Sequence, residues 1–154
     1  MSANHCGECT LCCKLLAINE LEKPEGQWCP NCAIGSRCRI YETRPQSCRD
    51  FSCIWLESQS LRNPLPAELR PDRCKMVLSF AENRRDVLGH CDPDSPDAWK
   101  GAPLRLLEVM SRQGLRVMFG NGHAHFAMDR GRARRVELAP PDDQGVRRFL
   151  RFLD

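Results

Sequence analysis

Short runs of apolar and β-branched residues in the second half of the chain predict a small β-sheet. Residues 75–80 (KMVLSF) and 86–91 (DVLGHC) are two such runs, and the polar segment between them predicts a hairpin. Residues 114–129 contain strand-like residues on both sides of Asn121-Gly122, a dipeptide that favours a tight hairpin turn. Residues 133–138 (ARRVEL) predict one further strand.

A different periodicity predicts helices before and after these last strands. Between residues 96 and 113, Leu104, Leu107 and Met110 recur at helical spacing and share one face. Beyond Pro140-Pro141, residues 142–154 predict a short amphipathic terminal helix, with an inward face made of Val146, Phe149, Leu150 and Leu153. We therefore expect residues 73–154 to form a small antiparallel sheet with one or two helices, which makes the fold class α+β.

The first part of the chain lacks such periodicity. Residues 1–56 are rich in cysteine and turn-forming residues, and residues 57–72 contain three prolines, which is typical of a connector. A chain of 154 residues is long enough to bury a core as one domain. We therefore expect a single domain, residues 1–154, in which the cysteine-rich region packs on the sheet.

Charge and hydropathy narrow the range of partners. The chain has 23 Lys+Arg against 20 Asp+Glu, a formal net charge of +3, which is too mild to predict a nucleic-acid partner. No stretch approaches the about 18 apolar residues of a membrane span, so we expect no membrane partner. The N-terminus lacks a basic segment followed by an apolar run. The sequence therefore predicts a cytoplasmic protein, and a protein partner stays open.

Cysteine is the unusual feature of the composition. There are eleven, and nine fall within the first 53 residues: Cys6, Cys9, Cys12, Cys13, Cys29, Cys32, Cys38, Cys48 and Cys53. Thiols stay reduced in the cytoplasm, so clustered cysteines predict metal ligands in preference to disulfides. Cys74 and Cys91 stand apart from the others and are predicted to be buried structural residues.

The spacing of the nine cysteines predicts more than one metal centre. The first four form C-x-x-C-x-x-C-C, and adjacent side chains such as Cys12 and Cys13 diverge, so one of them is expected to serve a second centre or to bridge two metals. Residues 29–35 (CPNCAIG) resemble the knuckle of zinc ribbons, in which a glycine supplies an unusual backbone angle. Because a structural zinc takes four protein ligands, the cysteines would hold about two zinc ions.

Iron is the alternative to zinc. The spacing C-x-x-C-x-x-C also begins the bacterial ferredoxin pattern, and four-thiolate sites accept iron as well as zinc. In that pattern the fourth cysteine lies further downstream and precedes a proline, whereas here Cys13 comes early and Lys14 follows it. The fit is partial, so iron or an iron–sulfur cluster stays open as the second cofactor.

The complete cysteine pattern is similar to that of a known family. It continues after C-x-x-C-x-x-C-C with Cys29, Cys32 and Gly35, and then with Cys38-x-Ile40-Tyr41, Arg44-Pro45 and Cys48-Arg49-x-Phe51-x-Cys53. Residues 6–56 thereby resemble the YkgJ-type cysteine-cluster proteins, described as the CxxCxxCC zinc- or iron-chelating domain. The chain departs from the commonest pattern in having both Cys29 and Cys32 and in adding Cys53. The resemblance implies metal chelation by these thiols, and a related cluster in flagellin lysine methylases leaves an enzymatic setting open.

Three other residues of the pattern have a predicted role beside the metal. A four-thiolate zinc site is negatively charged, so Arg44 or Arg49 is expected to donate to sulfur or to offset that charge. Tyr41 is expected to pack against the site. The alternative is that Tyr41 belongs to the core and the arginines to the solvated surface.

Three functions are compatible with the sequence. We favour a metal-binding protein without catalysis, because no general base next to a nucleophile can be read from the chain. The second function is an iron-dependent redox or modification enzyme, and whether the protein is an enzyme is left undecided. The third is a zinc-stabilised scaffold for protein or RNA contacts through the basic C-terminal third.

Overall fold

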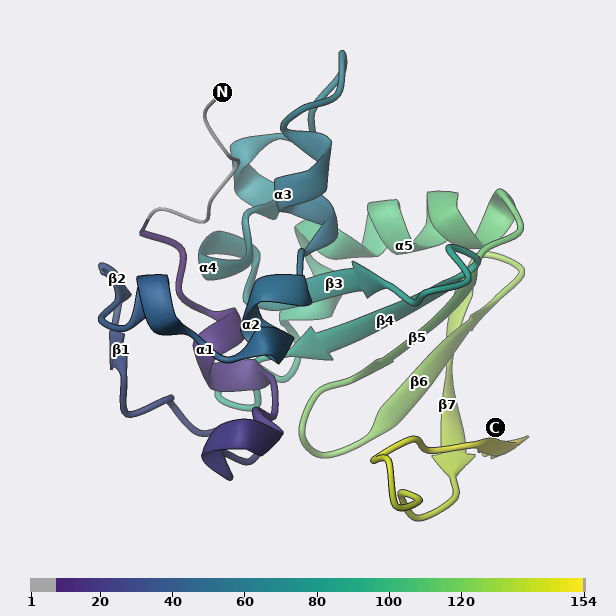
Figure 1. Cartoon of the computed structure of the whole chain (residues 1–154). Helices are drawn as coiled ribbons and strands as arrows, with labels where there is room; N and C mark the ends of the chain where they lie inside the picture. Colours follow the sequence, from purple (N-terminus) through teal and green to yellow (C-terminus); the bar gives the residue numbers. More distant parts are fainter. Residues whose placement is uncertain (1–7, 154) are drawn as a thin grey trace.

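The computed structural model describes residues 8–153, so Cys6 lies outside the described residues. A six-stranded sheet with a helix on one face makes up the C-terminal part (Figure 1). A region of short helices and turns, with a separate two-stranded sheet, precedes it. The fold class is α+β with a cysteine-rich N-terminal region, as the sequence predicts.

The large sheet has the strand order β3-β4-β5-β6-β7-β8. Its strands are β3 (Met76–Phe80), β4 (Asp86–Cys91), β5 (Arg116–Gly120), β6 (His125–Asp129), β7 (Arg132–Leu138) and β8 (Phe149–Phe152). The pairs β3–β4 and β5–β6 are antiparallel hairpins, which confirms both predicted hairpins. Asn121 and Gly122 lie in the second turn, where Gly122 has a φ of +84°, and β7 confirms the further strand.

One pair of strands departs from the predicted antiparallel sheet. β4 and β5 are parallel, with Val87 opposite Val117. Between them, η4 (Ala98–Lys100) and α5 (Ala102–Arg112) carry the chain back across one face of the sheet, so β5 starts at the same end as β4. The helix predicted within residues 96–113 is therefore confirmed as α5, and as a crossover it makes the sheet mixed.

The predicted terminal helix at residues 142–154 is wrong. Residues 149–152 form β8, which pairs antiparallel with β7. The Asp142 carboxylate accepts hydrogen bonds from two backbone N–H groups of the following turn, and Gly145 has a φ of +78°, so the backbone turns where a helix would have to continue. The four apolar residues that were expected to face inward are exposed instead.

The main core lies between α5 and the face of the sheet that this helix covers. Leu107 of α5 is fully buried and packs in one cluster with Val87 and Val117. Trp99 of η4 closes one end of this core, with its ring centroid 5.1 Å from that of Phe119. The helix-spaced apolar residues thus pack against the strands that the apolar and β-branched runs predict.

Gly89 of β4 lies on the covered face, where the packing leaves no room for a side chain. A Cβ atom there would lie 2.7 Å from both Met76 Cε and Phe119 Cβ. We expect Gly89→Ala to lower the free energy of unfolding by about 1–3 kcal/mol, measured by urea unfolding with tryptophan fluorescence. Leu88→Ala, at an exposed neighbouring position, should change it by about 0.5 kcal/mol or less. Equal stability of Gly89→Ala and the wild type would contradict this packing.

The N-terminal region consists of elements of five residues or fewer. They are α1 (Cys12–Leu15), η1 (Asn19–Leu21), β1 (Cys32–Ala33), β2 (Arg37–Cys38), η2 (Tyr41–Thr43), α2 (Gln46–Asp50) and α3 (Ile54–Ser58). Helices this short are unstable alone. Side-chain packing must therefore hold the region together.

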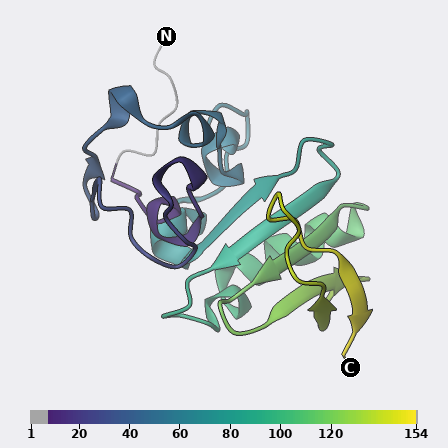
Figure 2. The ribbon, with the colours of Figure 1, turned by 60° about the horizontal axis from the view of Figure 1, so that its bottom comes forward.

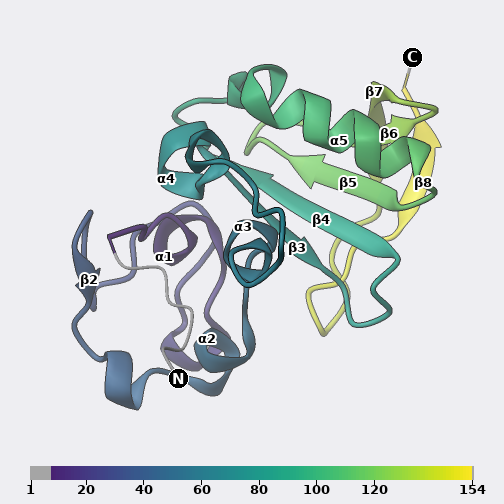
Figure 3. The same cartoon turned by 90° about the horizontal axis from the view of Figure 1, so that it is seen from above.

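β3 joins the N-terminal region to the sheet. Met76 and Leu78 belong to the α5 core, whereas Val77 between them packs with Leu11, Leu15 and Cys53 on the opposite side. Figure 3 shows α1 and α3 beside β3, with α5 over the other strands. Because these three residues of β3 are buried, the strand packs against the N-terminal region on one side and against the α5 core on the other.

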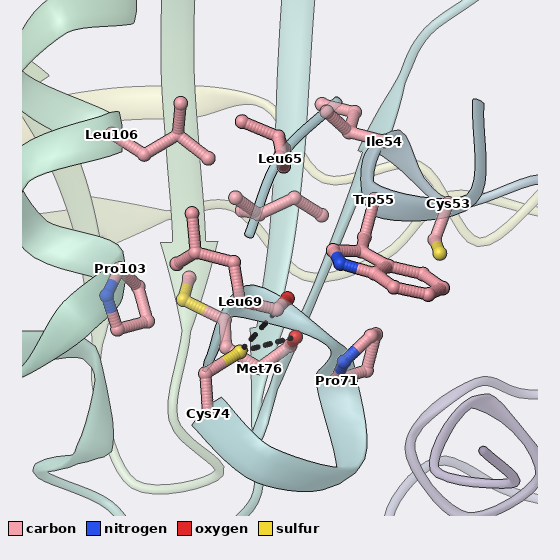
Figure 4. Close-up of a pocket in the computed structure, with 11 residues that line it drawn as sticks. Cys53, Ile54, Trp55, Leu65, Leu69, Pro71, Cys74, Met76, Pro103 and Leu106 are labelled. Atoms are coloured by element: carbon pink, nitrogen blue, oxygen red, sulfur yellow. Dashed lines mark hydrogen bonds between the residues drawn. The ribbon is translucent and has the colours of Figure 1, made fainter. Parts of the chain in front are cut away.

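The predicted connector, residues 57–72, is partly ordered into helical turns. It contains η3 (Ala67–Leu69) and leads into α4 (Pro71–Cys74). These turns, together with α3, β3 and α5, line an apolar cavity of about 10 Å³ (Figure 4), which is at the lower limit for one water molecule. The connector therefore packs against the core.

Of the two cysteines predicted to be buried structural residues, Cys91 is buried and Cys74 is half-buried, in the wall of the cavity that Cys53 also lines. Cys74 is half-buried in the cavity wall, where its thiol donates to the carbonyl oxygens of Leu69 (3.5 Å) and Met76 (3.4 Å) (Figure 4). Burial raises the pKa of Cys74 to about 11. Cys91 is buried and donates to the carbonyl oxygen of Ser95 at 3.3 Å. Both thiols thus donate to main-chain carbonyl oxygens that lie within five residues along the chain.

The basic C-terminal segment lies at the edge of the sheet opposite to the cysteine-rich region. β8 is the last strand at the edge away from β3 (Figure 2). There the Arg134 guanidinium lies 3.8 Å from the centre of the Phe152 ring, and Arg151 pairs with Glu137 at 2.5 Å.

Among residues 8–153, no helix has the length and apolar character needed to cross a bilayer.

Candidate metal centre

Four of the predicted ligands meet in one buried cluster. Cys29 and Cys32 are 6% and 7% exposed and pack with Ile18, and Cys13 and Cys48 lie against them. We call Cys13, Cys29, Cys32 and Cys48 the thiol cluster. They come from α1, from the turn before β1, from β1 and from α2, so the cluster brings together segments that are well separated in the sequence.

Backbone hydrogen bonds hold the segments of the thiol cluster in place. The N–H of Cys29 donates to the carbonyl oxygen of Cys13 at 3.0 Å and thereby fastens the knuckle to α1. The N–H of Cys32 donates to the carbonyl oxygen of Cys29, also at 3.0 Å, and closes the turn between the two residues. The sulfur atoms are thus presented from a framework that the main chain already constrains.

The turn that follows Cys32 has the backbone that the zinc-ribbon interpretation expects. Gly35 has a φ of +73°, a conformation that favours glycine. Its N–H donates to Thr10 Oγ1 at 2.9 Å, which ties the β1–β2 hairpin to the segment before α1. Thr10, whose side chain also hydrogen-bonds to Cys32, is a residue of the site that the spacing of cysteines does not reveal.

The adjacent cysteines contribute to two different clusters. Cys13 packs with the thiol cluster, whereas Cys12 packs with Leu11, Leu15 and Cys53 on the side of β3. This divergence is what the sequence argument expects of neighbouring side chains. The Cys12 and Cys13 side chains nevertheless remain joined by a hydrogen bond, so the two clusters are in contact.

The surroundings of the thiol cluster favour ionisation of one thiol. The hydrogen bond from Cys12, opposed by burial and assisted by a hydrogen bond from Cys32 and the charge of Lys23, lowers the pKa of Cys13 to about 6. Burial and the neighbouring charge of Cys13 raise the pKa of Cys32 to about 11, and burial also raises that of Cys48. Further ionisation within the cluster therefore requires additional positive charge.

Three further predicted ligands, Cys9, Cys38 and Cys53, are described by the structure outside the thiol cluster. Cys38 is half-buried opposite Cys32 in the β1–β2 ladder. Cys9 and Cys53 are each 6% exposed. The Cys9 side chain hydrogen-bonds to Asp72, and Cys53 Sγ accepts the N–H of Leu56 at 3.4 Å at the start of α3. Cys6, the ninth predicted ligand, is outside the described residues.

Tyr41, Arg44 and Arg49 interact mainly with one another and with the main chain. The Arg44 guanidinium lies 3.9 Å from the centre of the Tyr41 ring, and Tyr41 is 42% exposed. Arg49 donates to the carbonyl oxygens of Arg44 (3.0 Å) and Glu42 (2.9 Å). These contacts hold the loop from β2 to α2, which carries Cys38 and Cys48 at its two ends.

Two buried lysines flank the cysteines, and no spacing rule draws attention to them. Lys14, directly after Cys13, is 7% exposed and forms ion pairs with Asp92 (2.7 Å) and Asp94 (2.6 Å) beyond the end of β4. Lys23 is 5% exposed and donates to the carbonyl oxygens of Lys14 (2.9 Å) and Leu16. Lysine is mostly an exposed residue in folded proteins, so only the tertiary structure reveals that both are buried.

Comparison of the chain with protein-family models, with curated protein sequences and with solved structures gives no match. The resemblance to the YkgJ-type proteins therefore rests on the cysteine pattern of the sequence alone. The chemistry that the structure itself offers is that of the thiols and their surroundings.

The types of donor in the thiol cluster fit zinc or iron, since buried thiolates are the ligands that both metals accept. The spatial arrangement fits less closely. Within residues 8–153, no three His, Cys, Asp or Glu side chains converge on a point where they hold a metal ion. The donor set is thus present in one place, and ligation would have to draw the sulfur atoms closer together.

Proposed function

We propose that the protein binds zinc or iron through the thiolates of its N-terminal cysteines. The observation that carries this proposal is the thiol cluster itself, in which cysteines from four segments pack together in a buried site. The lowered pKa of Cys13 supports it, because the thiolate is the form that binds metal. The YkgJ-type cysteine pattern gives independent support from the sequence.

The first proposed centre uses Cys13, Cys29, Cys32 and Cys48. All four carry free thiols, and a tetrahedral structural site needs four such ligands. A bound ion would join α1, the knuckle and α2, which have little regular structure of their own. Metal binding is therefore expected to be coupled to the ordering of this region.

The second proposed centre lies on the other side of α1. Cys12 and Cys53 share the apolar cluster that rests on Val77 of β3. Completing a site there requires two further donors, which we propose are Cys6 and Cys9, whereas Cys38 lies opposite Cys32 beside the first centre. This assignment follows the sequence argument that the adjacent pair Cys12-Cys13 serves two centres.

We propose a role in binding or structure rather than in catalysis, in the cytoplasm. The apolar side chains of Ile18, Leu21 and Trp28 pack around the thiol cluster, which suits a structural site better than one that receives a substrate. Free thiols at four clustered cysteines suit a reducing compartment. An iron-dependent enzyme is the alternative that the same experiment decides.

Metal content is the test of this function. Protein purified without oxygen from its own host should contain about two zinc ions per chain by elemental analysis, with no visible absorbance. A brown chromophore with stoichiometric iron would support metal binding but favour the redox or modification enzyme. Protein that is fully reduced, folded and unable to take up either metal would contradict the proposed function.

A further inference from the structure

We propose that Lys23 is a built-in counter-ion of the thiol cluster, and that its buried positive charge raises the affinity of the cluster for a divalent metal. The inference rests on the proposed function and adds to it a residue outside the cysteine pattern. It also differs from the expectation drawn from the sequence, which gave this role to Arg44 or Arg49.

The position of the Lys23 side chain is fixed from two sides. Its backbone pairs with Ile18 in both directions, with N–H to carbonyl distances of 3.1 Å and 2.9 Å. Its ammonium group donates to the carbonyl oxygens of Lys14 and Leu16 at the C-terminal end of α1. The charge is thus held at the end of the short helix that carries Cys13.

Main-chain carbonyl oxygens, and not a paired carboxylate, accept the hydrogen bonds of the Lys23 ammonium group. Within residues 8–153, no ion pair joins Lys23 to an Asp or Glu, whereas the other buried lysine, Lys14, has two such partners. The backbone partner of Lys23, Ile18, packs against Cys29 and Cys32 of the thiol cluster. Burial lowers the pKa of Lys23, and the negative charges of Cys29, Cys13, Cys12 and Glu25 oppose that lowering. Three of these four opposing groups are cysteines of the site.

Charge balance explains why the site needs such a group. Four thiolates around a divalent ion leave about two negative charges in excess, and burying uncompensated charge is costly. Arg49 donates to main-chain carbonyls, and the Arg44 guanidinium stacks on Tyr41 with its Nε buried and without a hydrogen-bond partner among the described residues. Lys23 is 5% exposed and, unlike Lys14, carries its charge in this region without a paired carboxylate among the described residues.

Three variants separate the charge of Lys23 from its hydrogen bonds. Lys23→Met removes both, Lys23→Gln keeps N–H donors without the charge, and Lys23→Arg keeps the charge. Lys100→Met is the matched control, because it removes the same charge from an exposed lysine that pairs with Asp97. Zinc affinity is measured by competition with a chromophoric chelator, and folding of the reduced, metal-free protein by circular dichroism.

We expect Lys23→Met and Lys23→Gln to bind zinc about 10- to 100-fold more weakly, and Lys23→Arg and Lys100→Met to bind like the wild type. Lys23→Gln restores the folded signal if Lys23→Met loses it, so a loss of affinity in Lys23→Gln reports the charge. Wild-type zinc affinity in folded Lys23→Gln would overturn the inference and leave the proposed function intact. A wild-type protein that binds no zinc or iron would overturn both.

Discussion

Cys13→Ser is expected to reduce the metal content by about one ion per chain and to unfold the N-terminal region under conditions in which the wild type is folded. Cys13 connects the two clusters, since its side chain hydrogen-bonds to both Cys12 and Cys32. A structural zinc contributes about 10–16 kcal/mol of apparent binding free energy, so losing one of four thiolates removes a large part of the folding free energy of this region. Elemental analysis after desalting, together with thermal unfolding, measures both effects.

Cys74→Ser is the matched control for that prediction. Its thiol donates to two carbonyl oxygens in the cavity wall, and a serine hydroxyl can donate to the same acceptors. The metal content should stay at the wild-type value, with a loss of stability of about 1 kcal/mol or less. If Cys13→Ser retained all its metal while remaining folded, Cys13 would not be a ligand and the assignment of the first centre would be wrong.

The sheet shows which parts of the fold local sequence can predict. The hairpin at Asn121-Gly122 follows from a turn dipeptide, and α5 follows from helical spacing, because both depend on residues close in sequence. The parallel pairing of β4 with β5 depends on where α5 returns the chain, which no local pattern encodes. At β8, the helical spacing of apolar residues was misleading because Gly145 and the Asp142 turn interrupt the backbone before the helix could form.

The candidate site divides in the same way between local and tertiary information. Cysteine spacing predicted that Cys12 diverges from Cys13, since this is a property of neighbouring positions, whereas the set of metal ligands stays a prediction. It did not predict that Cys48 joins Cys13 while Cys9 turns to Asp72. Nor did it single out Lys23, the counter-ion that we propose, because its burial depends on the tertiary structure.

Lys14→Met is expected to lower the free energy of unfolding by about 3–5 kcal/mol at pH 7. The side chains of Lys14 and Asp92 are 9% and 8% exposed, so removing the ammonium leaves a buried carboxylate without its partner. The pair fastens α1 to the segment after β4, next to the thiol cluster. Urea unfolding measures the change, and Lys100→Met, which breaks the exposed pair with Asp97, should cost about 1 kcal/mol or less.

The pH dependence of the difference in unfolding free energy between the wild type and Lys14→Met shows whether the charge of Lys14 causes it. Burial tends to lower the pKa of Lys14, but hydrogen bonds to Asp92 and Asp94 outweigh it and raise the pKa above the ordinary value of 10.5. A raised pKa means that the stabilisation is fully present below pH 10.5 and is lost as the pH rises through the value in the folded protein. The stability difference between wild type and Lys14→Met should therefore stay constant from neutral pH to about pH 9.5 and shrink above pH 10.5. A difference that persists unchanged at higher pH would assign the effect to the apolar contacts of the side chain, because those do not depend on its charge.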